Sequence, residues 1–494
     1  MTAPLRRILS GTSCAALVIS NMIGTGIFTT TGFLAGDLGR PLLVLGIWVV
    51  GGIVALAGCF AYAELGMNIP RAGGEYAYLR EAWGPGWAFL SGWISFFAGF
   101  SAPIAATALA FSEYLRHYFP ALAANSEREP HLRWLHAGNA AWVSIGVIFF
   151  FAAINILGLP LASRLQNFLT ALKLGVIAVF LISAFALGHG EWSHFQMATQ
   201  RSSSHGLGAQ FAVSLIFVMF AYSGWNAASY VAEEIRDPER TLPLALGLGT
   251  GLVALLYVAL NVAFVYALPL EAMKGVVAVG AASSDALFGR HIGDFFSAAM
   301  AGALLSSISA MSLVGPRVYY AMGRDGCFPA GAAEVHPRWG TPVKAIVYQA
   351  ITSALMVLTG TFEALIYYIG FSLILFAALA VAGLLRLRTR PGFRRLRVVS
   401  WGLSGDPTAF CGNQLVDADL DVPPPPARKF SWFSYDSLRR DFLSLAASRL
   451  GRTVGSGKTT SRTVRGSTDR KREITLGPAT LRNALRCPRA TKAF

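Results

Sequence analysis

Long apolar runs separated by short polar segments dominate the chain from about residue 10 to residue 390. An α-helix needs roughly 20 apolar residues to cross the hydrocarbon core of a bilayer, and a window of that length predicts ten membrane-spanning helices. The predicted spans are residues 13–36, 42–67, 86–115, 139–158, 164–188, 209–233, 243–268, 293–322, 343–360 and 363–387. Because ten is even, both ends of this helical body lie on the same side of the membrane.

Two segments between the spans are predicted not to cross. Residues 75–87, EYAYLREAWGPGW, mix aromatic and charged side chains, as interfacial or re-entrant segments do. Residues 275–289 are too short and too rich in small residues to span, which favours a loop element on the outer side.

The pattern changes beyond residue 390, where no run reaches membrane length and four consecutive prolines precede a segment rich in Ser, Thr and Arg. We therefore divide the chain into a transmembrane core, residues 1–390, and a tail, residues 391–494. One interpretation of the tail is a basic, disordered cytoplasmic segment near anionic lipid. The alternative is a shift of reading frame after the tenth span.

Composition excludes several classes of protein. Of 494 residues, 54% are hydrophobic and 14% are charged, and ten long apolar runs do not fit inside one water-soluble core. The net charge of +15 would suit nucleic-acid binding, but residues 391–494 hold 19 Lys and Arg against 8 Asp and Glu, so most of the excess lies in the tail. We expect no nucleic-acid partner. Five cysteines without CxxC spacing predict neither a zinc site nor a disulfide framework, and we expect no metal or cofactor.

The distribution of basic residues predicts the orientation. If the N-terminus is cytoplasmic, fourteen Lys and Arg of the core lie at inner loops and seven at outer loops, and only Lys173 falls inside a span. The positive-inside rule then favours two cytoplasmic termini. We expect a multi-pass protein of the plasma membrane, with an oligomeric state that the sequence leaves open.

The first span contains helix-breaking residues at its centre. Residues 20–32 read SNMIGTGIFTTTG, in which Gly24 and Gly26 flank Thr25. Glycine lowers helix stability by about 1 kcal/mol relative to alanine. A half-helix that begins here would present free amides and a positive dipole end, which suit a carboxylate. Close packing between helices also uses paired small residues and is the alternative interpretation.

The sixth span repeats this feature. Residues 220–226 read FAYSGWN, so that Ser223, Gly224 and Asn226 interrupt its middle. The first and sixth spans hold corresponding places in two sets of five, residues 13–188 and 209–387, and an odd number of spans gives the second set inverted topology. Interrupted spans in matching positions indicate the midplane binding site of a secondary transporter.

Three motifs resemble one known family. The motifs are NMIGTGIF in the first span, AYAELGMNIPRAGGEYAYL after the second, and FAYSGWN with EEIRDPERTLP in the sixth. They are similar to the amino acid, polyamine and organocation (APC) superfamily, and within it to the L-type amino acid transporter branch, over about residues 10–390. The resemblance implies an all-α LeuT-type fold of five-plus-five inverted repeats, with spans one and six broken around a central amino-acid site. Members of this branch usually have twelve spans, so the shorter helical body puts stability and oligomer packing in question.

The resemblance also implies roles for individual residues. Those that would hold the substrate carboxylate are Ile23, Gly24, Thr25 and Gly26. Those whose backbone carbonyls would accept from the ammonium group are Phe220, Ala221 and Ser223, and the Phe220 ring would also gate the site. Further pocket wall would come from Asn21, Trp225 and Asn226. A zwitterion needs donors at one end and acceptors at the other, which agrees with this assignment.

Lys173 is the candidate for ion coupling. It lies roughly 14 Å into its helix at 1.5 Å per residue, and charges at that depth are usually functional, although a lysine can also snorkel to the surface. Relatives often place a lysine where sodium-coupled transporters bind an ion, so this amine would replace sodium or carry a proton. Ser306, Ser307 and Ser309 are weaker candidates for its neighbourhood.

The acidic residues provide less information about the substrate. Glu64, Glu113, Glu233 and Glu234 lie near predicted helix ends, so a cationic substrate lacks a midplane partner and a neutral amino acid is favoured. We therefore expect a sodium-independent amino-acid permease or exchanger that works by alternating access. The alternative is a truncated, transport-inactive protein that only binds amino acid. A membrane enzyme is a weaker third hypothesis, because the spans show no nucleophile and base pair and no metal-ligand spacing.

Overall fold

The structure is a computed structural model that describes residues 5–119, 138–203, 205–276, 278–359 and 362–396. All of these belong to the first of two compact units into which the chain divides. Residues 391–396 of the predicted tail are described, whereas residues 397–494 lie outside the described residues. The interpretation of the tail as disordered or frame-shifted therefore stays a prediction.

The described residues are almost entirely helical. The α-helices are α1 (Gly11–Met22), α2 (Gly26–Leu38), α3 (Pro41–Asn68), α4 (Glu75–Trp83), α5 (Pro85–Ile94), α6 (Ala102–Tyr118), α7 (Asn139–Ile156), α8 (Leu159–Ala186), α9 (Leu207–Tyr222), α10 (Ala227–Tyr230), α11 (Pro238–Ala267), α12 (Leu270–Met273), α13 (Val279–Phe288), α14 (Arg290–Arg324), α15 (Val343–Thr359) and α16 (Phe362–Leu387). A π-helix covers Ser95–Ser101, and 3-10 turns cover Trp192–Gln196, Ala232–Glu234 and Ala330–Ala333.

The helices agree with the predicted spans in position. Seven helices of the described part are long and apolar enough to cross a membrane, and three shorter apolar helices, Leu207–Tyr222, Val343–Thr359 and Leu375–Leu387, fall within the remaining predicted spans. Prolines in the first turn of α3, α5 and α11 explain where these helices begin, because proline at that position sacrifices no intrahelical hydrogen bond. The segment predicted not to span at residues 75–87 begins with the short helix α4, and residues 275–289 contain the ten-residue helix α13.

Spans one and six are broken, as the sequence predicts. The first span divides into α1, which ends at Met22, and α2, which begins at Gly26. The sixth divides after Tyr222, and its second part is only α10 and one 3-10 turn. The predicted helix over residues 209–233 is therefore shorter than expected, because the turn at 223–226 ends it within the apolar segment.

The third span contains a π-helical segment that the sequence does not predict. Between α5 and α6 the residues Ser95–Ser101 form a π-helix, in which the Ala102 amide bonds to the Phe97 carbonyl five residues earlier. Pro103 follows directly and has no amide hydrogen, and its ring would clash with the carbonyl four residues before it. The wider π-turn accommodates this proline, and turns of this kind are frequent at functional sites.

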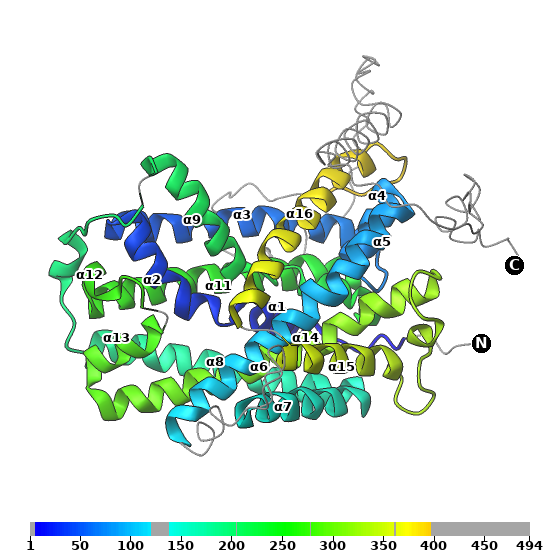
Figure 1. Cartoon of the computed structure of the whole chain (residues 1–494). Helices are drawn as coiled ribbons and strands as arrows, with labels where there is room; N and C mark the ends of the chain where they lie inside the picture. Colours follow the sequence, from blue (N-terminus) through cyan, green and yellow to red (C-terminus); the bar gives the residue numbers. More distant parts are fainter. Residues whose placement is uncertain (1–4, 120–137, 204, 277, 360–361, 397–494) are drawn as a thin grey trace, which may run out of the picture. The chain divides into compact units, whose positions relative to one another are not determined.

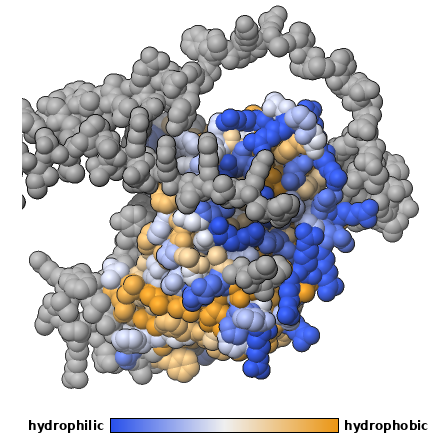
Figure 2. Space-filling model, turned by 90° about the vertical axis from the view of Figure 1, so that its right-hand side faces the viewer, coloured by the Kyte–Doolittle hydropathy of each residue, from blue (hydrophilic) through white to orange (hydrophobic). Residues whose placement is uncertain are grey.

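Hydrophilic side chains cluster at one end of the helical bundle. In Figure 1 the α4 label lies at the right-hand end and α12 and α13 at the left. Figure 2 looks onto the right-hand end, where hydrophilic side chains cluster beside a band of apolar residues. Ion pairs at this end include Arg324 with Glu233 at 3.0 Å, the fully buried pair of Arg317 with Glu234 at 2.7 Å, and Arg388 with the buried Glu64.

The N-terminal segment is bonded to the end of the sixth span. The Ile8 and Leu9 amides both donate to the Glu234 carbonyl at 2.9 Å, and the Arg236 amide donates to the Leu9 carbonyl at 3.0 Å. Leu9 and Ile235 thus form an isolated parallel β-bridge. The start of α1 and the end of the broken sixth span are held together by backbone hydrogen bonds.

Candidate functional site

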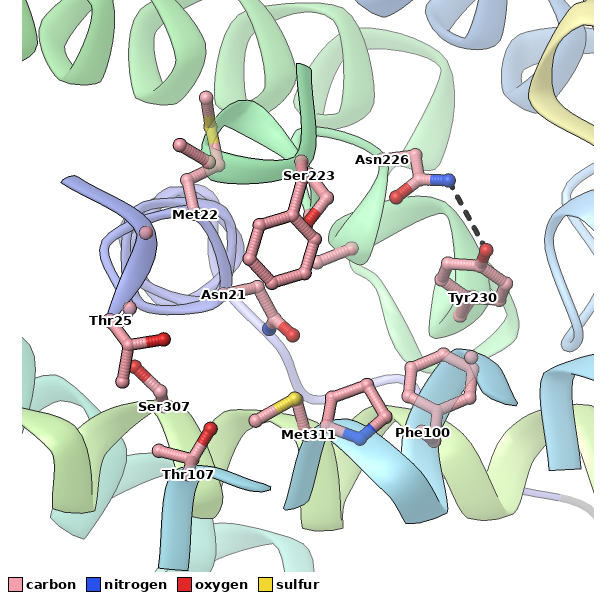
Figure 3. Close-up of a pocket in the computed structure, with 18 of the residues that line it drawn as sticks. Asn21, Met22, Thr25, Phe100, Thr107, Ser223, Asn226, Tyr230, Ser307 and Met311 are labelled. Carbon is pink, nitrogen blue, oxygen red and sulfur yellow. Dashed lines mark hydrogen bonds between the residues drawn. The ribbon is translucent and has the colours of Figure 1, made fainter. Parts of the chain in front are cut away.

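A cavity of about 100 Å³ lies where the two broken spans meet the third and eighth spans. One buried water needs about 10–15 Å³ on this measure, so the cavity has room for a compact ligand of several heavy atoms. The lining residues are Asn21, Met22, Gly24, Thr25, Gly26, Ser95, Gly99, Phe100, Pro103, Thr107, Phe220, Ala221, Ser223, Gly224, Asn226, Ala227, Tyr230, Ser307 and Met311. In Figure 3, Thr25, Ser307 and Thr107 lie on one side of the cavity, and Phe100, Tyr230 and Asn226 lie on the other.

The first break leaves donors at the start of α2. The Ile23 amide donates to the Ile19 carbonyl and the Gly24 amide to the Met22 carbonyl, both at 2.9 Å, so these two amides have backbone partners. The first helical hydrogen bond of α2 is donated by Phe28 to the Thr25 carbonyl. The amides before Phe28, from Thr25 to Ile27, therefore stand at a helix N-terminus, where intrahelical acceptors are lacking.

Gly24 and Gly26 have different structural roles. A methyl group added at Gly24 would meet nothing within 4 Å, so this glycine opens directly onto the cavity. A methyl group at Gly26 would lie 2.8 Å from the Ala221 Cα and 2.9 Å from its Cβ. Gly26 thus allows α2 and α9 to pack backbone to backbone. Gly26 therefore serves close packing between helices, the alternative considered from the sequence, whereas Gly24 leaves open space at the break.

The second break depends on a glycine with an unusual backbone conformation. Gly224 has φ +98°, which L-residues rarely adopt. A Cβ there would lie 2.8 Å from the Asn21 carbonyl carbon, so the two breaks are in close contact. The Asn226 side chain donates to the Tyr230 hydroxyl at 3.2 Å, which is the dashed line in Figure 3.

Tyr257 of α11 connects the two breaks from behind. Its hydroxyl lies 2.6 Å from the Met22 carbonyl and 2.9 Å from the Ala221 carbonyl, and its side chain is fully buried. These two carbonyls belong to the last turns before each break, where helical donors run out. The single hydrogen of this hydroxyl can be donated to either carbonyl, so one side chain contacts both breaks.

Lys173 of α8 lies behind the first break rather than in the cavity. Its buried ammonium group donates to the carbonyls of Ser20 and Ile23 and, at 2.9 Å, to the Ser307 hydroxyl. Ser307 in turn donates to the Ile23 carbonyl at 2.9 Å and also lines the cavity. The amine is therefore held by neutral oxygens of α1, of the first break and of α14, and the Ser307 hydroxyl separates it from the cavity.

Most of the residues chosen from the sequence come together in the structure. Asn21, Gly24, Thr25, Gly26, Phe220, Ala221, Ser223 and Asn226 all line the cavity. Two do not. The Ile23 amide is used within α1 and its carbonyl faces Lys173 and Ser307, while the Trp225 ring packs edge-on against Tyr62 at 4.8 Å.

Sequence reasoning missed the wall opposite the breaks. This wall consists of the π-helical residues Ser95, Gly99 and Phe100, with Pro103 and Thr107 of α6, Tyr230 of α10 and Met311 of α14. A proline after a stretch of small residues was the only local signal for the π-helical segment. None of the lining residues in the described part of the chain is charged, so the cavity offers backbone groups, hydroxyls and aromatic rings to a ligand.

Comparisons with known proteins identify relatives over most of the chain. A family model described as amino acid permease matches residues 9–412, which extends past the predicted core boundary at residue 390. The human large neutral amino acids transporter small subunit 2 is 30% identical over 390 residues, which cover 78% of this chain and 70% of that protein. The human b(0,+)-type amino acid transporter 1 is 29% identical over 78% of this chain and 77% of its own length. The human cystine/glutamate transporter is 30% identical over 76% of this chain and 72% of its own length.

A solved structure confirms the architecture. The crystal structure of MhsT in complex with L-phenylalanine matches with a TM-score of 0.54 over 77% of this chain and 89% of that chain. At 15% identity the match concerns the fold. The polytopic LeuT-type fold with broken spans one and six, predicted from the sequence motifs, is confirmed.

Proposed function

The chain belongs to the amino acid permease family, and on that premise we propose that it is a sodium-independent secondary transporter, a permease or exchanger, that moves neutral amino acids by alternating access. The observation that carries this proposal is the pairing of two helix breaks around one uncharged cavity. One break supplies backbone donors and the other supplies backbone acceptors. A zwitterion has matching groups at its two ends.

The substrate carboxylate binds at the N-terminus of α2 in this proposal. The amides of Thr25 and Gly26 and the Thr25 hydroxyl surround that end of the cavity, and the helix dipole favours a negative charge there. Gly24 contributes space rather than its amide, because that amide already has the Met22 carbonyl as partner.

The substrate ammonium group binds at the second break. The carbonyls of Phe220 and Ala221 each accept one hydrogen bond already, from the Ser223 amide and the Tyr257 hydroxyl, and each keeps a second lone pair. Phe220 lines the cavity and is the candidate aromatic gate. The substrate side chain then extends toward Phe100 and Tyr230, away from Thr25 (Figure 3).

A neutral side chain fits this cavity better than a charged one. A cationic or anionic side chain would enter a space whose described lining carries no opposite charge, and an unpaired charge in a protein interior is costly. The similar human protein, large neutral amino acids transporter small subunit 2, is named for neutral substrates.

Sodium independence follows in this proposal from Lys173. Its amine donates to the Ser20 and Ile23 carbonyls, which are the backbone oxygens that a sodium ion near the first break would need. In this proposal the amine thus takes the place of a sodium ion, and Lys173 remains the candidate for any coupling through this site.

Transport assays on purified protein in liposomes test the proposal. We expect exchange of radiolabelled neutral amino acids that persists when choline replaces sodium, with little exchange of lysine or glutamate. Protein-free liposomes and the variant Gly24→Leu, which fills the cavity, are the controls.

Each alternative predicts a different result. Amino-acid-dependent thermal stabilisation without transport would replace the permease by a protein that only binds amino acid. Loss of exchange in choline would contradict sodium independence, and no response to any amino acid in either assay would refute the proposed function.

The proposal places the protein in the plasma membrane with both termini cytoplasmic. The arginine-rich end of the bundle, which contains Arg71, Arg80 and Arg324, would then face the cytoplasm. Accessibility of an epitope inserted between residues 200 and 206 to antibody on intact cells tests this orientation, since that loop is expected outside.

A further inference from the structure

Glu75 is a buried carboxyl group that has no role in the site described above. It is the first residue of α4, it is 4% exposed, and it lies against α3 and α5. The Tyr62 hydroxyl donates to its Oε2 at 2.7 Å and the Ser91 hydroxyl to its Oε1 at 3.5 Å. Two other buried glutamates, Glu64 and Glu234, each have an arginine partner. No basic side chain in the described part of the chain pairs with Glu75.

The neighbouring elements offer Glu75 hydroxyl groups rather than charges. The hydroxyl groups around it are Tyr62 from α3, Ser91 from α5 and Tyr230 from α10, and the Tyr78 ring packs against Tyr62. Five charged side chains near the C-terminal ends of α14 and α16 have other partners. These are Arg317 with Glu234, Arg324 with Glu233, Asp325 with Arg80, Arg386 over the Trp83 ring and Arg388 with Glu64.

The turn before Glu75 packs directly on a cavity-lining residue. The Gly73 amide donates to the Tyr230 carbonyl at 3.0 Å. Gly74 has φ +45°, and a Cβ there would lie 2.8 Å from Tyr230 Cδ1, so only glycine permits this contact. Tyr230 lines the cavity and accepts from Asn226 through its hydroxyl. A movement of the 73–75 turn would therefore displace Tyr230 and with it the wall of the cavity.

We propose that Glu75 is a proton-binding site coupled to the cavity, protonated in the conformation described here and ionised in a conformation in which the 73–75 turn leaves Tyr230 and the carboxylate meets water. The proposal deepens the transport function above and rests on it. The chemical step is proton transfer alone: the carboxylate takes a proton from water, and the acid returns it to water after the turn has moved.

Opposing contributions make Glu75 responsive near neutral pH. Burial without a cation raises the pKa of Glu75 to about 7, against hydroxyl donation by Tyr62 and Ser91, which lowers it. The N-terminus of α4 also favours the charged form. Because these donors stabilise the ionised carboxylate, Glu75 can lose its proton within the physiological pH range.

The sign of the pH effect follows from linkage. A hydrated glutamate has a pKa of about 4.3, so the conformation with Glu75 buried binds its proton more tightly than the open one. Acidification below about pH 7 therefore favours the conformation described here. This extra stability relative to the open conformation is lost as the pH rises through that value. The equilibrium between the two conformations is expected to change by about 20-fold between pH 7.5 and pH 5.5.

Infrared difference spectroscopy of the purified full-length protein tests the protonation itself. We expect a carboxylic acid band that titrates near pH 7, that is absent from Glu75→Gln, and that remains in Glu81→Gln, a matched change on the same helix at a half-buried, ion-paired position. Should Glu75→Gln fail to fold, Tyr62→Phe removes a donor to the carboxylate and is expected to move the midpoint upward. A wild-type protein without such a band would overturn the proposal.

Amino-acid exchange in liposomes, measured between pH 5.5 and pH 8.5, tests the coupling. We expect Glu75→Gln to lose the pH dependence and to behave at every pH as the wild-type protein does when acidic, whereas Glu81→Gln keeps the wild-type profile. A wild-type profile in Glu75→Gln would overturn the coupling. Since the infrared band needs no substrate, a titrating band without any transport would count against the permease and not against the proton site.

Discussion

The two glycines of the first break allow a matched pair of substitutions, one expected to impair binding and the other to impair stability. Gly24→Ala adds a methyl group that meets no protein atom within 4 Å and therefore occupies the cavity itself. Gly26→Ala adds the same methyl group 2.8 Å from the Ala221 Cα, which forces α2 and α9 apart. If the carboxylate binds at the N-terminus of α2, Gly24→Ala impairs binding and Gly26→Ala impairs stability.

The expected magnitudes follow from these contacts. A methyl group in a cavity of about 100 Å³ displaces the carboxylate from the Thr25 and Gly26 amides. A hydrogen bond to a charged group contributes about 1.5–3 kcal/mol, and the loss of one raises Kd by roughly 10- to 100-fold. Overpacking at Gly26 costs about 1–3 kcal/mol of stability.

The assay measures thermal unfolding of detergent-purified protein with and without a saturating neutral amino acid, and Kd by titration. Gly46→Ala is the matched control, because its methyl group also has open space around it but lies on α3, outside the cavity lining. We expect Gly24→Ala to unfold at the wild-type temperature without ligand and to lose most of the ligand-induced stabilisation. An unchanged Kd in Gly24→Ala would refute the placement of the carboxylate at this break.

Three further substitutions test the surroundings of the site. Lys173→Met removes a donor to the first break and leaves the buried Ser20 carbonyl without its amine donor at about 1–3 kcal/mol, while the Ile23 carbonyl keeps Ser307. We expect this change to abolish ligand-induced stabilisation; normal stabilisation would contradict this role. Tyr257→Phe keeps the ring but removes the hydroxyl shared by both breaks, so Kd should rise roughly tenfold, and unchanged titration curves would argue against it. Glu234→Gln leaves the buried Arg317 charge without its partner and is expected to cost about 3–5 kcal/mol of stability. Its control, Glu239→Gln at an exposed ion pair, should cost less than about 1 kcal/mol in the same unfolding assay.

The sequence predicts the spans and the breaks because both depend on local properties. Twenty apolar residues suffice to cross a bilayer wherever they occur, and two glycines beside a threonine weaken a helix whatever surrounds them. The position of the first break therefore agrees with α1 ending at Met22 and α2 beginning at Gly26. The length of α10 was not predictable in this way, because the turn after Ser223 is held by its contact with Asn21.

The remaining parts of the site depend on tertiary contacts. Trp225 follows Gly224, whose positive φ turns the chain so that the ring packs on Tyr62 instead of entering the cavity. Tyr257 and Glu75 lie in ordinary apolar or mixed segments, and only the folded chain brings them to the breaks and to Tyr230. Single-chain patterns contain no signal for such pairings.

Glu234 is anchored twice, since its carbonyl receives the amides of Ile8 and Leu9 while its carboxylate receives the Arg317 guanidinium. The N-terminal segment and the end of the sixth span are therefore joined to each other, and Arg317 is their only buried charged contact with α14 among the described residues. A tether that immobilises the chain around Leu9 would arrest the sixth span at Ile235 as well, although the two are far apart in the sequence. The N-terminal segment is thus a place where the sixth span can be restrained without any change to the cavity.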